Sequence, residues 1–196
     1  MESPSSYRDA SRARLRDALV GAARDLTVAH GWASVRMMDV ARAAGVSRQT
    51  VYNEFDGRAG LAEAIAVREI ERFVHAVRTE LFAHGADVRA AAYAAVLHTL
   101  REAAGNALVR AILTSARGGA DELLPYLTTR SDTALAPAGA VIAEWAAVHL
   151  PEAGEEAVAL AGDAVIRLTI SHIMLPSDTP EATAAALAEV FARLLS

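Results

Sequence analysis

Residues 37–58 read MMDVARAAGVSRQTVYNEFDGR, and this stretch carries the signals of two short helices joined by a tight turn. Val40, Ala41 and Ala44 have the spacing of one buried helical face, which predicts a first helix from about residue 37. Gly45 is expected to end this helix, because the residue after a helix often needs a positive φ, which costs other residues roughly 1 kcal/mol.

The second helix of this hairpin is predicted from Arg48 to Phe55. Ser47 precedes it, and a serine hydroxyl can accept a hydrogen bond from a free backbone N–H at the start of a helix. Val51 and Phe55 are four residues apart and should face inward. The outer side then carries side chains that suit phosphates and base edges, namely Arg48, Gln49, Thr50, Tyr52 and Asn53.

The pattern Val-Ala-x-x-Ala-Gly-Val-Ser-x-x-Thr-Val-Tyr-x-x-Phe, followed by a basic residue, resembles the DNA-binding segment of TetR/AcrR-type bacterial transcriptional regulators. The resemblance is free of gaps and covers about residues 15–61. It implies that Ser47 and the five outward residues contact DNA, and that Arg58 stands where the family usually has a phosphate-binding Lys. An ordinary αα-hairpin without a DNA role is the alternative, but it would not need these polar side chains on one surface.

Two residues depart from the family pattern. Arg36 stands where a Thr or Ser usually caps the first helix of the hairpin, so this cap is either missing or supplied by Ser34. Glu54 stands where His is frequent. A carboxylate should repel phosphates, so Glu54 is not among the predicted DNA contacts.

Composition favours an all-α protein. The chain has 196 residues, of which 53% are hydrophobic and only 5% aromatic, and its abundant alanine suits closely packed helices. With no Cys, a disulfide framework or a thiol nucleophile is excluded, and a reducing cytoplasm is the expected compartment. The N-terminus shows no signal-peptide pattern and no run approaches the ~18 apolar residues of a membrane span, so no membrane association is expected.

The charge distribution favours DNA binding by the N-terminal part of the chain. The net charge of −5 alone argues against a nucleic-acid partner. However, residues 1–60 hold nine Arg against seven acidic residues, whereas residues 61–196 hold ten Arg against seventeen. The basic surplus therefore accompanies the hairpin.

Helices are expected on both sides of the hairpin. Residues 1–8 should be a frayed tail. A helix over residues 9–30 should follow and pack against the hairpin. Trp32 and Val35 are expected to be buried apolar plugs, which fill the space between this helix and the hairpin. A long helix over residues 58–82 should span about 37 Å. Further helices are predicted at residues 87–104, 106–116, 155–175 and 180–195. Asn106 is expected as the N-cap of the second of these, and Gly118-Gly119 as the stop after it. Residues 121–150 are expected to form two shorter helices.

Pro137 is expected to kink or split its helix, because proline lacks a backbone donor. The last two predicted helices carry alanine-rich apolar faces, and in the resembling family these helices pair with their copies in a second subunit. A monomer would expose those faces to water, so a homodimer through the last two helices is predicted.

No catalytic, metal or cofactor site is predicted. The six His residues are scattered without the i, i+4 spacing of a helical zinc site, and no G-x-S-x-G motif occurs. The chain has no Lys, which excludes a lysine-containing phosphate loop.

A ligand pocket is implied by the family resemblance. Tyr93 and Trp145 are the preferred contacts, because each is on an apolar helical face and has one polar atom, and Leu97 and Ile142 accompany them. For each residue, core packing, a surface position or a place in the dimer interface explains the pattern at least as well as ligand contact. The part of the chain after the hairpin has few polar side chains that could contact a ligand, so the effector is expected to be largely apolar.

The sequence therefore predicts an all-α protein with a three-helix DNA-binding head over residues 1–57, joined by a long helix to a larger helical lobe for ligand binding and dimerisation over residues 58–196. The expected function is a ligand-responsive regulator, most simply a repressor, which binds a palindromic operator as a homodimer. The alternatives are a helical enzyme or ligand-binding protein that keeps the hairpin only as scaffold, and a regulator without an effector.

Overall fold

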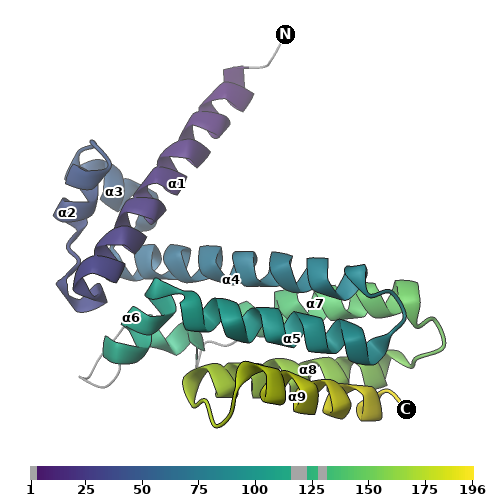
Figure 1. Cartoon of the computed structure of the whole chain (residues 1–196). Helices are drawn as coiled ribbons and strands as arrows, with labels where there is room; N and C mark the ends of the chain where they lie inside the picture. The colour runs from purple at the N-terminus through teal and green to yellow at the C-terminus, as the bar shows by residue number, and fades with distance from the viewer. Residues whose placement is uncertain (1–3, 116–122, 128–131) are drawn as a thin grey trace. The chain divides into compact units, whose positions relative to one another are not determined.

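The computed structural model describes residues 4–115, 123–127 and 132–196, and in these ranges the chain is helical without any strand (Figure 1). The all-α prediction is confirmed. The elements are α1 (Pro4–His30), η1 (Trp32–Ser34), α2 (Met37–Ala43), α3 (Arg48–Phe55), α4 (Arg58–Ala83), α5 (Val88–Gly105), α6 (Ala107–Ser115), η3 (Leu124–Leu127), α7 (Asp132–His149), α8 (Glu155–Met174) and α9 (Pro180–Leu194).

The chain forms two compact units, and the boundary between them falls within α4. One unit comprises residues 1–68 and 110–125, and we call its residues 4–68 the head. The other comprises residues 69–109 and 126–196, and we call it the lobe. A functional boundary between residues 57 and 58 stays a prediction.

The core of the head is built from α1, η1, α2, α3 and the start of α4. Trp32 and Val35 are 1% and 4% exposed, which confirms their prediction as buried plugs. The other fully buried side chains include Leu19, Val40, Val51, Leu61 and Ile65. The head therefore has an apolar centre of its own.

The first helix begins earlier than predicted. It starts at Pro4, so a frayed tail over residues 4–8 is wrong. Proline is favourable in the first turn of a helix, because its fixed φ is helical and its missing N–H would have had no partner there.

In the lobe, α5 packs against α9, and α8 packs against both α7 and α9 (Figure 1). The core contains Trp145, Phe191 and Leu187 together with many alanines, such as Ala91, Ala95, Ala161, Ala184 and Ala188. Small side chains let helix axes approach closely. The buried Asn106 begins α6 as predicted, since its Oδ1 accepts hydrogen bonds from the N–H groups of Leu108 and Val109.

Of the two predicted effects of Pro137, a split of the helix is wrong, and a kink stays a prediction. Pro137 lies inside α7, which runs without interruption from Asp132 to His149. The missing N–H affects only the hydrogen bond to the carbonyl four residues earlier, near the start of the helix, and the proline φ is itself helical. The predicted stop at Gly118-Gly119 lies outside the described residues.

In the described part of the chain, α8 is the one helix whose length and apolar composition would allow it to cross a membrane. Only 28% of the most apolar stretch of α8 is buried within the chain. Helices that pack against other helices meet the same criterion, so this finding is weak evidence for a membrane span.

Candidate DNA interface and ligand cavity

The turn between α2 and α3 is closed by backbone hydrogen bonds. The N–H of Val46 donates to the carbonyl of Ala41 at 2.9 Å, and the N–H of Gly45 donates to that of Arg42 at 3.2 Å. Gly45 has φ +68°, a conformation that side chains with a Cβ rarely adopt. The prediction that Gly45 ends the first helix of the hairpin is confirmed.

Ser47 caps α3 as predicted. Its Oγ accepts a hydrogen bond from the backbone N–H of Thr50 at 3.1 Å and lies 2.8 Å from the Thr50 hydroxyl. At the start of α2, by contrast, the side chain of Arg36 forms no capping hydrogen bond. A DNA contact by Ser47 stays a prediction, and its hydroxyl already holds the first turn of α3 in place.

The two sides of α3 face as the sequence predicts. Val51 and Phe55 are 0% and 4% exposed and pack into the head. Four of the five predicted outward residues are exposed and Thr50 is half-buried; the exposed four are Arg48, Gln49, Tyr52 and Asn53. The polar side of α3 is therefore accessible to a partner.

The four exposed side chains form two pairs along α3. A guanidinium N–H of Arg48 donates to the Tyr52 hydroxyl at 3.1 Å, and its Cζ lies 5.1 Å from the centre of the Tyr52 ring. The amide of Gln49 donates to Oδ1 of Asn53 at 2.8 Å. Each pair orders its members but leaves hydrogen-bonding groups unused, since guanidinium has five N–H donors and each amide has two donors and an acceptor.

Glu54 pairs with two arginines of α1. Its carboxylate lies 3.0 Å from Nε of Arg12 and 3.2 Å from Nη1 of Arg16, both on α1, and its side chain is only 9% exposed. A carboxylate in this segment is therefore neutralised within the head. This pairing was not predicted, because it joins residues about 40 positions apart.

Arg58 has a structural role that sequence reasoning missed. Its guanidinium donates hydrogen bonds to the carbonyls of Val35 and, at 2.6 Å, Trp32, and lies 4.6 Å from the centre of the Trp32 ring. These contacts tie the start of α4 to η1 and the residue after it. Phosphate binding by Arg58 stays a prediction and would have to use its remaining N–H groups.

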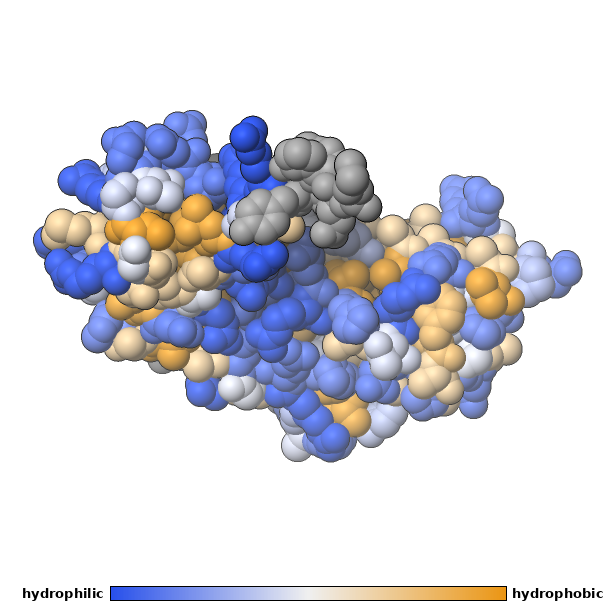
Figure 2. All heavy atoms as spheres, turned by 90° about the horizontal axis from the view of Figure 1, so that it is seen from above, coloured by the Kyte–Doolittle hydropathy of each residue, from blue (hydrophilic) through white to orange (hydrophobic). Residues whose placement is uncertain are grey.

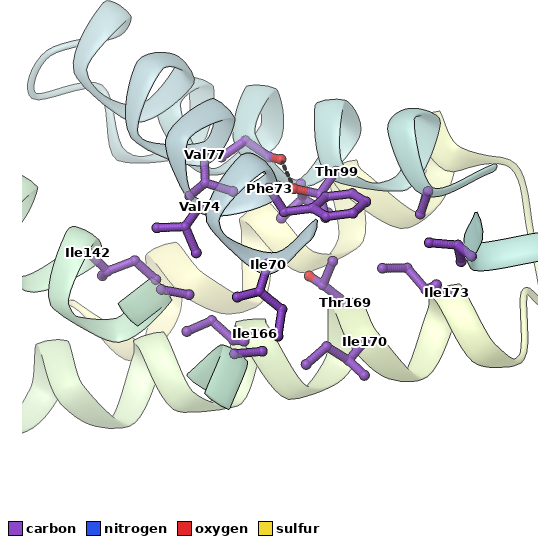
Figure 3. Close-up of a pocket in the computed structure, with 16 residues that line it drawn as sticks. Ile70, Phe73, Val74, Val77, Thr99, Ile142, Ile166, Thr169, Ile170 and Ile173 are labelled. Atoms are coloured by element: carbon purple, nitrogen blue, oxygen red, sulfur yellow. Dashed lines mark hydrogen bonds between the residues drawn. The ribbon is translucent and has the colours of Figure 1, made fainter. Parts of the chain in front are cut away.

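A cavity of about 140 Å³ lies within the lobe, lined by α4, α5, α7 and α8 together with Val109 (Figure 3). Aliphatic and aromatic carbon atoms form nearly all of its wall. The largest lining side chains include Ile70, Phe73, Val77, Ile142, Ile166 and Ile173. None of the lining residues in the described part of the chain is charged.

Among the described residues, Thr99 and Thr169 are the polar side chains on the cavity wall. The Thr99 hydroxyl donates to the carbonyl of Ala95 at 2.8 Å, and that of Thr169 donates to the carbonyl of Val165 at 2.7 Å. Because each hydroxyl hydrogen is already used, neither residue has a donor left for a guest. The cavity therefore suits a guest that needs no hydrogen-bond donor from its wall.

Of the four predicted ligand contacts, only Ile142 lines this cavity. Trp145 is fully buried in the core, and its indole N–H donates to the carbonyl of Gly85 at 3.0 Å, so its polar atom is not free for a guest. Tyr93 and Leu97 are partly buried against the core instead of lining the cavity.

The missed lining residues follow a recognisable pattern. Ile70, Phe73 and Val77 on α4, and Ile166, Ile170 and Ile173 on α8, recur at intervals of three and four residues. Such spacing marks one apolar helical face. It does not reveal whether that face meets another side chain or a cavity. Among the described residues, no group of three His, Asp or Glu could hold a metal ion.

Two family models match the chain. One, described as bacterial regulatory proteins of the tetR family, matches residues 19–65. The other, described as the C-terminal domain of the bacterial tetracyclin repressor, matches residues 87–193. Together they cover both the hairpin and most of the lobe.

Similar proteins agree with these matches. The HTH-type transcriptional regulator AlkX of Mycobacterium tuberculosis is 35% identical over 189 residues, which cover 94% of this chain and 86% of that protein. The crystal structure of the TetR family repressor AlkX from Dietzia sp. has a TM-score of 0.75 at 30% identity and covers 92% of this chain and 94% of its own.

RolR in complex with resorcinol has a TM-score of 0.65 at 18% identity, covering 92% of this chain and 89% of its own, and this likeness shows the fold alone. The family consists of regulators, which are generally not enzymes, so the reading of the hairpin as a mere scaffold is not favoured. The chain belongs to the TetR family of bacterial regulatory proteins, and it is a ligand-responsive DNA-binding transcriptional regulator of a kind that usually represses.

Proposed function

We propose that this regulator is a cytoplasmic, non-enzymatic repressor that binds a palindromic operator as a homodimer and is released by a largely apolar small molecule. The observation that carries the DNA-binding part is the outer side of α3, where Arg48, Gln49, Tyr52 and Asn53 are exposed over the buried Val51. An α-helix of this kind fits the major groove of B-DNA.

The two pairs on α3 suit different parts of the duplex. The amides of Gln49 and Asn53 have the donor and acceptor arrangement that binds the edge of adenine. Arg48 suits guanine or a phosphate, and the Tyr52 hydroxyl suits a phosphate. Ser47, Thr50 and Arg58 are proposed as additional backbone contacts.

The lobe offers α8 and α9 as the dimer interface. Leu160 and Leu168 on α8 are 60% and 39% exposed, and Val190 and Leu194 on α9 are 38% and 37% exposed. A second copy related by a two-fold axis would cover these side chains on both subunits. The same arrangement accounts for an apolar α8 of which little is buried inside one chain.

The effector proposed for the lobe has an apolar body and occupies the cavity beside Ile142. A volume of about 140 Å³ is close to that of the ~150 Å³ engineered cavity that binds benzene, so a hydrocarbon group of that size fits without rearrangement. The Dietzia AlkX repressor is implicated in the biodegradation of n-alkanes. Alkyl chains have the uncharged surface that this wall suits.

The coupling proposed between effector and DNA uses α4. Ile70, Phe73 and Val77 line the cavity, and the same helix begins at Arg58, three residues after α3 ends. A guest that shifts α4 would change the separation of the two α3 helices in a dimer. The size of the response is limited by the guest's preference for one dimer geometry over the other.

DNA binding is tested by selection from a pool of random duplexes. Duplexes retained by the purified protein at low ionic strength should carry inverted half-sites with centres about one helical turn apart. Binding should weaken steeply as salt increases. A protein that retains no duplex at low salt would refute the proposed function and favour a helical ligand-binding protein or enzyme.

Dimerisation and effector class need separate measurements. Wild-type protein should sediment as a dimer, whereas Leu168→Arg should sediment as a monomer. In a thermal-shift assay, cyclohexane and short n-alkanes should raise Tm, because a guest that binds the folded state stabilises it. Stabilisation by charged metabolites only would refute an apolar effector.

A further inference from the structure

Three arginines form a stripe along the first half of α1. Arg8, Arg12 and Arg16 are four residues apart, so their side chains lie on one face of the helix. All three are exposed. Eight residues of helix span about 12 Å, so the stripe presents three positive charges in a short row.

The end of this stripe is fixed to α3. Arg16 Nη1 donates to both the backbone carbonyl and the carboxylate of Glu54, each at 3.2 Å, and its guanidinium carbon lies 4.6 Å from the centre of the Phe55 ring. Arg12 donates from Nε to the other carboxylate oxygen of Glu54 at 3.0 Å. The two guanidiniums are thus held beside the helix that exposes the DNA-facing side chains.

This arrangement keeps a surplus of positive charge accessible. A single carboxylate, that of Glu54, faces two guanidiniums, and it is itself only 9% exposed, whereas the side chains of Arg12 and Arg16 are 69% and 47% exposed. Each guanidinium has five N–H donors, and the contacts with Glu54 use only one nitrogen of each. Ordering them in advance lowers the entropy lost when they bind a partner.

We infer that the Arg8–Arg12–Arg16 stripe binds the sugar-phosphate backbone of DNA beside the major-groove segment that α3 enters. This inference rests on the proposed function and extends its interface beyond the hairpin. Figure 2 shows one face of the molecule, on which hydrophilic residues alternate with apolar patches. A row of guanidiniums that ends beside α3 suits a linear polyanion, because guanidinium pairs with phosphate in bidentate geometry.

The test compares single substitutions on α1 by their effect on the salt dependence of DNA binding. The probes are a duplex enriched by the wild-type protein and a random-sequence duplex of the same length. Arg8→Ala and Arg12→Ala should each lower the slope of log K against log salt by about 1 and weaken binding roughly 3- to 10-fold on both probes. Arg12→Lys should keep most of the slope, because it retains the charge.

Arg14→Ala is the matched control. Arg14 has the same charge and is exposed on the same helix, but it is two residues from Arg12 and therefore lies on the opposite side. Equal slopes for Arg8→Ala, Arg12→Ala and Arg14→Ala would overturn the inference while leaving the proposed function intact. Wild-type protein that binds neither probe would overturn both. Thermal melting of each variant identifies any loss of binding that comes from unfolding.

Discussion

The outer side of α3 and the cavity of the lobe use their polar groups in opposite ways. On α3, Arg48 and Gln49 each bind a neighbour four residues on and still have donors left. In the cavity, the hydroxyls of Thr99 and Thr169 donate to carbonyls of their own helices and have none left. Recognition by α3 should therefore depend on charge and hydrogen bonds, and recognition by the cavity on shape and apolar contact.

The two regions should respond differently to solution conditions and to changes in the partner. Phosphate contacts release counterions, so binding through α3 should weaken strongly with salt. Apolar burial is insensitive to moderate salt, but it discriminates weakly, since one methylene group is worth only about 1–3 kcal/mol. The lobe should accept a class of related guests, whereas the head should select a sequence.

Gly60→Ala should destabilise the protein by about 3 kcal/mol or more, because overpacking against backbone cannot relax. A Cβ at position 60 would lie 1.9 Å from the carbonyl oxygen of Phe55, which ends α3. Gly139→Ala on α7 is the control, since nothing lies within 4 Å of its added Cβ. It should stabilise by about 0.5–1 kcal/mol. Urea unfolding of both variants measures the difference, and a neutral Gly60→Ala would contradict the tight α3–α4 junction.

Arg58→Ala should lower the free energy of unfolding by about 2 kcal/mol, because it removes charge-assisted hydrogen bonds to the carbonyls of Trp32 and Val35. Arg58→Lys should recover only part of this loss, since an ammonium group cannot reproduce the planar fork. Unchanged stability with weakened DNA binding would instead assign Arg58 to phosphate alone.

Ala138→Leu should weaken binding of a hydrocarbon probe at least about tenfold, a loss of about 1.4 kcal/mol, because the larger side chain occupies the cavity. Ala143→Leu is a control on the same helix, where the side chain is exposed and does not line the cavity. Thermal shift with cyclohexane reads out both variants. Salt slopes of DNA binding should be the same for both variants as for the wild type.

Tyr52→Phe should weaken operator binding about 3- to 10-fold, since a hydrogen bond to phosphate is worth roughly 1 kcal/mol. The Tyr52 side chain is exposed, so its Tm should stay close to that of the wild type. A large fall in Tm with normal residual binding would mean that Tyr52 supports the head from inside.

Glu189→Gln should have the smallest effect, confined to the lobe. Arg89 and Arg193 both donate to its carboxylate and lower the pKa of Glu189 from its ordinary value to about 2. Because the pKa is lower in the folded state, these ion pairs stabilise the protein above about pH 4.5 and lose this effect as pH falls toward 2. The small difference in Tm between wild type and variant should therefore disappear over this range, in melts recorded at low salt.

The sequence predicted more details of α3 than of the cavity in the lobe. In the head, the bounds of α3, the cap by Ser47 and the inward facing of Val51 were predicted correctly, because each depends on residues at most four positions apart. In the lobe, Trp145 was predicted as a ligand contact, but it does not line the cavity. An aromatic residue on an apolar helical face has the same sequence pattern whether its indole N–H meets a guest or, as here, the carbonyl of Gly85.

Most of the helices, the turn at Gly45 and the polar side of α3 could be predicted from the chain alone, since helical periodicity, caps and glycine conformations are encoded locally. Three further features became visible only in the folded chain: Glu54 binds two arginines of α1, Arg58 donates to the carbonyl of Trp32, and Ile142 lines a cavity. These outcomes depend on the fit between helices distant in sequence, and that fit is set by packing in three dimensions, which no spacing along the chain reveals.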